Sequence, residues 1–218
     1  FVLVGDHNQL PPVVRAENDL TESLFERLQK QYPEASTLLN RQYRMAQRIQ
    51  SFPSREFYDC RLRPATGEVA ARSVTDLSGV TPTALPAHLR ERVTFLDPEG
   101  HADGNTNPVE ADAVADVVDS YLAAGLSPAD IGVIAPYRAQ VATVRRRVPD
   151  DVTVDTVDRF QCSSTEVIVV SFVATGSLDG PIFEDYRRAN VALTRAKRGL
   201  VLVGDREALG SDDTYARM

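Results

Sequence analysis

The sequence predicts an α/β fold, in which a mostly parallel β-sheet is flanked by helices on both faces. Short apolar segments with the length of strands alternate with amphipathic, helix-like segments along the 218 residues. The run Val167-Ile168-Val169-Val170 is apolar at every position, although successive side chains of a strand point to opposite faces of a sheet. Such a strand must be covered on both faces, which is typical of a buried parallel sheet.

The individual elements follow from local patterns. Strands are predicted at residues 1–4, 93–97, 131–135, 152–154, 167–173 and 200–203, and helices at residues 21–30, 47–58, 108–123, 137–147, 185–197 and 206–209. The helix at 108–123 has the clearest start, because Asn107 is a good cap, Pro108 suits the first turn and Glu110 occupies the capping-box position. Residues 61–92 combine Pro, Gly, Ser and Thr with weak periodicity, which indicates a loop-rich excursion.

The segment 185–197 is the most informative of the expected helices. At helical spacing its residues, and Arg198 after them, sort into an apolar stripe, a polar stripe and a basic side: Ala189, Ala192, Leu193 and Ala196; Asn190, Thr194 and Lys197; Arg188, Arg195 and Arg198. Small apolar residues would let this helix pack closely against a sheet while its arginines face a phosphate. A solvated basic face is the alternative.

In an open parallel sheet, ligands bind at the carboxyl ends of the strands. The segments expected there are residues 5–12, 136–140 and 156–164, and Asp205. Gln9 lies on a loop stiffened by two prolines, where it could bond a phosphate oxygen or orient a water. The alternatives are a structural turn for this loop, a capped turn around Thr156, and a surface pair for Arg44, which precedes the helix at 47–58.

Composition narrows the classes of function. The net charge of −7 does not favour nucleic-acid binding, although an acidic mean leaves room for a local basic groove. No apolar run approaches the ~20 residues that span a bilayer, so no membrane partner is expected. Cys60 and Cys162 lie far apart without a metal-ligand spacing, and no secretion signal precedes the first strand. These features predict a cytoplasmic location and no metal site. The abrupt start at Phe1 predicts a fragment of a longer polypeptide.

Four segments occur in a fixed order: Gly-Asp-x-x-Gln-Leu-Pro-Pro, Gln-Tyr-Arg-Met, Thr-Val-Asp-x-Phe-Gln and Val-Ala-Leu-Thr-Arg-Ala-Lys. Together they resemble the C-terminal half of superfamily 1 helicases, in the DNA2/NAM7-like branch of nonsense-decay and replication/repair enzymes. The resemblance covers residues 1–60 and 93–205. It implies a RecA-like P-loop NTPase fold of the AAA type. Residues 1–36 would be the end of a first RecA-like domain with a connector, and residues 37–218 a second motor domain.

The resemblance also implies roles for individual residues. Gln9 would sense the γ-phosphate of ATP, and Arg44 and Arg195 would be arginine fingers that neutralise charge on the phosphoryl oxygens. The implied nucleotide contacts are Asp6, Gln9, Arg44, Gln161, Cys162, Ser164 and Arg195. The implied contacts to single-stranded DNA or RNA are Pro136, Tyr137, Arg138, Gln140 and Thr156. A helix start at Tyr137 would suit phosphate binding independently, and this ring could stack a base or simply pack in the core.

Two departures from the family pattern bear on nucleotide handling. Cys162 and Ser164 stand where the family usually has Gly and Glu. No Gly-x-x-x-x-Gly-Lys-Ser/Thr phosphate loop occurs in the 218 residues, and no Asp-Glu pair precedes Gly5. ATP and Mg²⁺ would therefore be held mainly by the first RecA-like domain of the same chain, and this stretch is not expected to hydrolyse ATP alone. The alternative is a non-catalytic module, derived from a helicase, that binds nucleic acid or protein.

Overall fold

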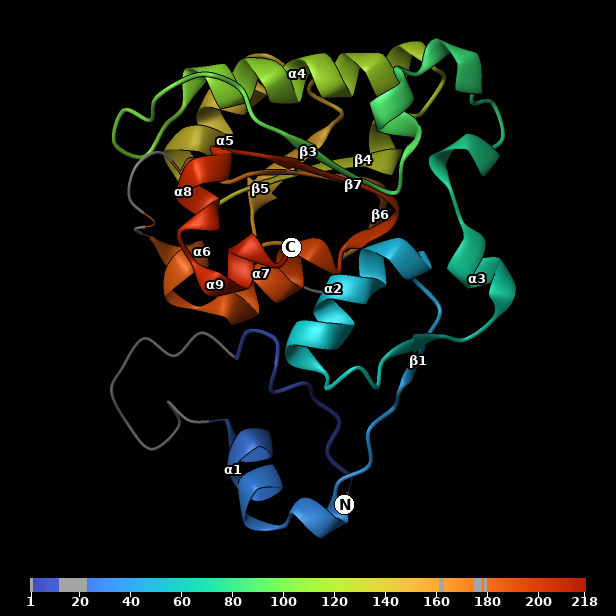
Figure 1. Ribbon diagram of the computed structural model, residues 1–218, viewed down its shortest axis with the longest axis vertical. Coiled ribbons are helices and arrows are strands. Elements are labelled where there is room, and N and C mark those ends of the chain that lie inside the picture. Colours follow the sequence, from blue (N-terminus) through green and yellow to red (C-terminus); the bar gives the residue numbers. More distant parts are fainter. Residues whose placement is uncertain (1, 12–22, 161–162, 175–177, 179) are drawn as a thin grey trace.

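A computed structural model describes residues 2–11, 23–160, 163–174, 178 and 180–218 (Figure 1). Its centre is a five-stranded sheet in the order β3-β7-β6-β4-β5, and every neighbouring pair is parallel. The strands are β3 (Val93–Leu96), β4 (Ile131–Ala135), β5 (Thr153–Thr156), β6 (Thr165–Ser171) and β7 (Ala196–Val203). The predicted α/β class with a parallel sheet is confirmed.

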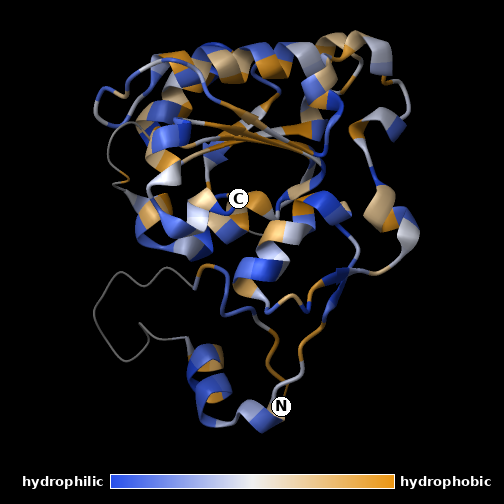
Figure 2. Ribbon diagram, viewed as in Figure 1, coloured by the Kyte–Doolittle hydropathy of each residue, from blue (hydrophilic) through white to orange (hydrophobic). Residues whose placement is uncertain are grey.

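Helices cover both faces of this sheet. On one face lie α4 (Pro108–Ala123) and α5 (Arg138–Arg145); on the other lie α2 (Gln47–Phe57), α6 (Pro181–Glu184), α7 (Tyr186–Leu193), α8 (Arg206–Gly210) and α9 (Asp213–Ala216) (Figure 1). Strand β6 feeds both cores, because Val167 and Val169 pack with α4 while Ile168 and Val170 pack with α7. Figure 2 shows the apolar residues gathered along these strands and on the adjoining helix faces. This arrangement explains the uninterrupted apolar run.

Residues 61–92, the expected loop-rich excursion, contain only short elements. Between residues 61 and 92 lie β2 (Arg63–Pro64), α3 (Gly67–Ala71), and the 3₁₀ turns η2 (Val74–Asp76), η3 (Pro82–Ala84) and η4 (Ala87–Arg90). Strand β2 pairs in parallel with β1 (Arg41–Gln42). Val74, Leu85 and Leu89 are buried against α4. The excursion therefore contributes to the core even though it has little regular structure.

The N-terminal part differs from the sequence prediction. The described residues of the expected strand at 1–4 pair with no other strand among the described residues, and Val2 and Val4 are largely exposed. A strand forms only when a neighbour accepts its hydrogen bonds, and no described strand lies beside this segment. Helix α1 (Leu24–Gln31) and the turn η1 (Pro33–Ala35) follow, and neither contains a buried residue.

The helix expected at 185–197 is also corrected. Helix α7 ends at Leu193, residues 194–195 form a turn, and Ala196 already belongs to β7. Sheet pairing overrides the helical periodicity here, because the backbone of Ala196 joins Thr165 of β6. The three arginines therefore do not share one side of a helix, and Arg198 lies on a strand.

Other boundaries agree more closely with the pattern. Helix α4 and strand β4 have the predicted bounds, and Asn107 caps α4 by accepting the N–H of Glu110. The chain also forms η5 (Pro128–Asp130) before β4. Within the described residues, no helix combines the length and apolar character needed to cross a bilayer.

Candidate functional site

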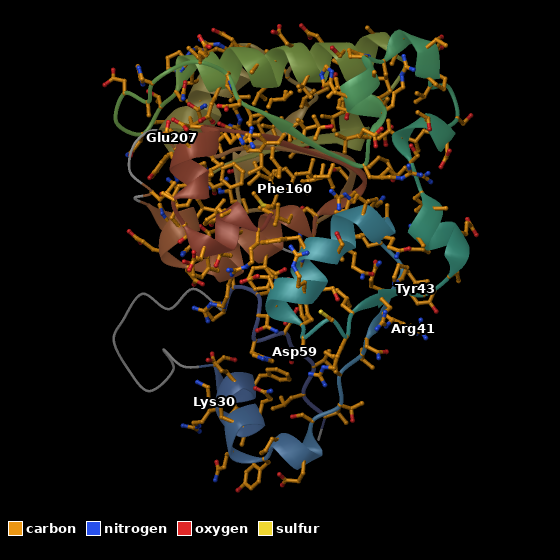
Figure 3. The ribbon with its side chains drawn as sticks, in the orientation of Figure 1. Lys30, Arg41, Tyr43, Asp59, Phe160 and Glu207 are labelled. Carbon is orange, nitrogen blue, oxygen red and sulfur yellow. The ribbon has the colours of Figure 1, made fainter. Side chains whose placement is uncertain are left out.

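A cleft of about 1480 Å³ separates the N-terminal segment from the body of the protein. Asp59 and Tyr43, which line it, lie on the side of the body that faces this segment (Figure 3). Four of the predicted nucleotide contacts line this cleft, although they come from distant parts of the chain: Asp6, Gln9, Arg44 and Ser164. Gln161 and Cys162 lie outside the described residues. The structure thus brings together the described members of the predicted set, with Arg195 immediately behind them.

This cluster lies at the amino ends of the strands, which corrects the prediction that 5–12 and 156–164 act from the carboxyl ends. Ser164 directly precedes β6, and Arg195 directly precedes β7. Residues 157–164 lead from the carboxyl end of β5 to the amino end of β6. The buried Phe160 (Figure 3) packs against Gly132 of β4.

Arg195 is only 3% exposed, and its guanidinium is held by several oxygen atoms. Nη2 donates to Oε1 of Gln9 at 3.1 Å. The other acceptors are the carbonyl oxygens of Val191 and Ser163 and the hydroxyl of Thr194. The guanidinium therefore lies just below the cleft surface, in direct contact with the residue expected to sense phosphate.

Arg44 reaches the residue that precedes Arg195. Its Nη1 donates to the carbonyl oxygen of Thr194 at 2.9 Å, and its side chain is half-buried in the cleft wall. A turn at Gln42 sets its direction, since Oε1 of Gln42 accepts the backbone N–H groups of Arg44 and Met45. The two arginines, 151 positions apart in the sequence, thus converge on the single residue that precedes Arg195.

A buried polar network holds the loop that carries Gln9. The Tyr58 hydroxyl donates to Oδ2 of Asp6 at 2.6 Å, and Nε2 of Gln9 donates to the same oxygen at 2.8 Å. Asn190 of α7 donates to both the Asn8 carbonyl and the Tyr58 oxygen. Burial, and then the hydrogen bond and charge of Asp6, raise the pKa of the Tyr58 phenol. Sequence reasoning missed Tyr58, because nothing in its local pattern marks a partner 52 residues away.

A set of ion pairs forms another wall of the cleft. Glu166 accepts hydrogen bonds from Lys197 at 2.6 Å and from Arg198 at 2.8 Å. Burial acts to raise the pKa of Glu166, but the bonds and charges of these two cations outweigh it and hold the pKa below its ordinary value. Arg198, expected on the basic side, and Lys197, expected in the polar stripe, are therefore both engaged with one carboxylate.

The predicted nucleic-acid contacts lie at the opposite, carboxyl edge of the sheet. Arg138 is exposed at the first position of α5, and Tyr137 is half-buried before it. Pro136, which is buried, directly follows the end of β4, and Thr156 ends the adjacent strand β5 in register with Ala135. These four residues are neighbours, as expected.

Gln140 is a correction to the predicted set. Its side chain is fully buried and bonds Asn107 and Ser171 inside the protein. It cannot contact a nucleic acid directly in this arrangement. Helix α5 turns this position inward toward α4, which the sequence motif alone does not reveal.

Comparisons with known proteins decide the family. The family model described as AAA domain matches residues 20–207. This chain belongs to that family. An uncharacterised ATP-dependent helicase of Methanocaldococcus jannaschii is 37% identical over 233 residues, which cover all of this chain and 34% of the relative. The DNA replication ATP-dependent helicase/nuclease DNA2 of Xenopus laevis is 37% identical, covering 94% of this chain and 22% of the relative.

These relatives confirm the resemblance seen in the four motifs. The chain is an AAA-family domain of the superfamily 1, DNA2/NAM7-like helicases, with a RecA-like fold. It spans about a third or less of the length of the curated relatives it matches. Among solved structures, the C-terminal domain of a possible Lactobacillus plantarum DNA helicase aligns with a TM-score of 0.49 at 12% identity, covering 80% of this chain and 92% of that one.

Proposed function

We propose that this AAA-family domain is the second motor domain of an ATP-dependent helicase or translocase that acts on single-stranded nucleic acid. In this proposal, residues 1–36 belong to the end of the first motor domain and its connector, and residues 37–218 form the second. The observation that carries it is the convergence of Gln9, Arg44 and Arg195 at one cleft, where Gln9 contacts Arg195 at 3.1 Å across 186 positions of sequence.

The donors present at this cleft fit a triphosphate. Guanidinium groups match the geometry of phosphate oxygens, and charge spreads over those oxygens during phosphoryl transfer. Arg44 presents its side chain at the cleft wall, while Arg195 holds Nη2 against the Gln9 oxygen. A phosphate oxygen is a stronger acceptor than an amide oxygen, so it would replace Gln9 as the partner of Arg195.

Two of the carboxylates that line the cleft are occupied by protein donors, and a third, the exposed Asp59, lies 3.7 Å from Arg61. Asp6 accepts hydrogen bonds from Tyr58 and Gln9, and Glu166 is engaged by two cations. We therefore assign Asp6 to supporting Gln9, and we expect Mg²⁺ to be held by the first motor domain. ATP would supply the phosphoryl group, and the arginines of this domain would stabilise its charge.

We assign the contacts to single-stranded nucleic acid to the carboxyl edge of the sheet. Arg138 is exposed there at the start of α5, next to Tyr137 and Thr156. A guanidinium at a helix N-terminus suits a phosphate backbone. The net charge of −7 does not oppose this, because only the local charge near the strand matters.

The test uses the complete helicase with an Arg195→Ala substitution. Strand-stimulated ATP hydrolysis should fall by about 10³-fold or more, while single-strand affinity should stay nearly unchanged. Arg187→Ala is the matched control, because Arg187 lies on α7 but is paired with Asp185. Unchanged turnover in Arg195→Ala would refute the finger assignment. If nucleotide has no effect on the affinity of the complete protein for single-stranded nucleic acid, the motor proposal is replaced by that of a non-catalytic binding module.

A further inference from the structure

The carboxyl edge of the sheet contains a fully buried glutamate whose presence the proposed nucleic-acid contacts do not explain. Glu110, on the first turn of α4, is 1% exposed. Its Oε2 accepts the Ser171 hydroxyl at 2.6 Å and the Val173 backbone N–H at 2.9 Å. Its Oε1 accepts Nδ2 of Asn107 at 3.3 Å. These donors are all neutral. The Glu110 side chain contacts Ser171 of β6, and the N–H of Asn107, which a capping box would direct to Glu110, donates to Gln140 instead.

Gln140 completes this network from a third element. Its Nε2 donates to the Asn107 carbonyl and to the Ser171 hydroxyl, both at 3.0 Å, and its Oε1 accepts the Asn107 N–H at 2.9 Å. All four side chains are at most 1% exposed. We call this set, Asn107, Glu110, Gln140 and Ser171, the polar clamp. It joins the start of α4, the start of α5 and the end of β6.

The clamp bonds a backbone that is in an unfavourable conformation. Val173 has a φ of 55°, which a β-branched residue adopts only when its surroundings impose it. The N–H of this residue donates to Glu110. The carboxylate therefore stabilises the backbone just after β6 in a direction that the valine would otherwise avoid.

The loop before α5 is confined from its other side as well. Gly180 has a φ of 117°, and a Cβ atom placed there would lie 1.8 Å from the Tyr137 hydroxyl. Tyr137 is thus packed directly against the backbone of Gly180. Gln140 fixes the same loop to β6 through Ser171. Two independent contacts therefore hold residues 136–140, one from Tyr137 to Gly180 and one from Gln140 to Ser171 at the end of β6.

We propose that the polar clamp is a positioning device for strand binding, which fixes the loop 136–138 relative to the backbone of residues 173–174. The proposal rests on the assignment of strand contacts to this edge. A carboxylate close to a nucleic-acid backbone would repel it if exposed. Glu110 is instead buried, with both oxygens bonded to protein donors, and it acts on the nucleic acid only through the loops that it orders.

The experiment measures, in the complete helicase, the concentration of an oligo(dT) single strand that half-stimulates ATP hydrolysis. Glu110→Gln places an amide N–H donor against the Nδ2 donor of Asn107 and so disrupts the polar clamp. Because the binding loop is then less well positioned, the half-stimulating concentration should rise about tenfold. The turnover number at saturating strand should stay unchanged. Asp116→Asn, an exposed carboxylate on the same helix, is the matched control. Ser171→Ala removes the bonds of this hydroxyl to Glu110 and Gln140 without changing either of those residues, and it serves if Glu110→Gln does not fold.

A second substitution separates positioning from general stability. In the Glu110→Gln background, Val173→Gly should restore the half-stimulating concentration to within about twofold, because glycine adopts positive φ without support. A lowered melting temperature with an unchanged half-stimulating concentration overturns the proposal, and so does the absence of rescue. Arg138→Ala tests the proposed nucleic-acid-binding surface itself. If this substitution leaves the half-stimulating concentration of oligo(dT) unaltered, the assignment of that surface fails, whatever the clamp variants show.

Discussion

The hydroxyl of Tyr58 offers a one-atom test of how the Gln9 loop is held. Tyr58→Phe removes the 2.6 Å hydrogen bond to Asp6 and leaves the ring in place. A hydrogen bond to a charged group contributes about 1.5–3 kcal/mol. No orphan group results, because Asp6 keeps its bonds from Gln9 and the Asn8 N–H, and Asn190 keeps the Asn8 carbonyl. We therefore expect the lower part of this range, about 2 kcal/mol.

The assay is urea unfolding of the chain, with Tyr186→Phe as the control. Tyr186 also donates to an aspartate, Asp212, at 2.8 Å, but its side chain is exposed. Exposed polar contacts exchange with water at little net cost, so this control should lose less than about 0.5 kcal/mol. Equal losses in the two variants would mean that Tyr58 does not hold Asp6 in solution, and the account of the Gln9 loop would be wrong.

Three further predictions follow from the geometry. Burial raises the pKa of Glu110 from 4.5 to about 7, so the folded chain binds this proton more tightly than the unfolded chain. The free energy of unfolding should therefore fall by about 3 kcal/mol between pH 4.5 and 7 and level off above. In urea unfolding, Glu110→Gln should show a flatter dependence on pH. Gly125→Ala should destabilise the chain by more than about 2 kcal/mol in the same assay, because φ is 103° and the new Cβ would meet a backbone oxygen; Gly67→Ala, with nothing within 4 Å, should be neutral or slightly stabilising. In the complete helicase, Arg44→Ala should lower strand-stimulated ATP turnover about 10³-fold, whereas Arg41→Ala, at an exposed neighbouring position, should not.

Some of the candidate site could be predicted because its residues lie in compact, ordered motifs. Gln9, Arg44 and Ser164 do line one cleft, and Arg138 is exposed at the start of a helix. Tyr58 could not be predicted, because its role depends on a contact with Asp6 that only the folded chain makes.

Gln140 shows why a motif position does not fix accessibility. It lies two residues after the exposed Arg138, yet it is fully buried. Successive helical residues point in different directions, and only the packing of α4 against α5 decides which direction is interior. The burial is tolerated because Asn107 and Ser171 satisfy each polar atom of the amide.

The sequence by itself determined the local elements with strong signals. The caps around Pro108 set the start of α4, and the apolar runs of β4 and β6 required a sheet covered on both faces. Tertiary structure decided where α7 ends and at which edge of the sheet the cleft forms. The reason is that alanine and arginine favour a helix at the local level, so only the pairing of Ala196 with Thr165 could override that preference and end the helix. That pairing sets Arg195 at the amino end of β7, beside Gln9, a partner that no local pattern specifies.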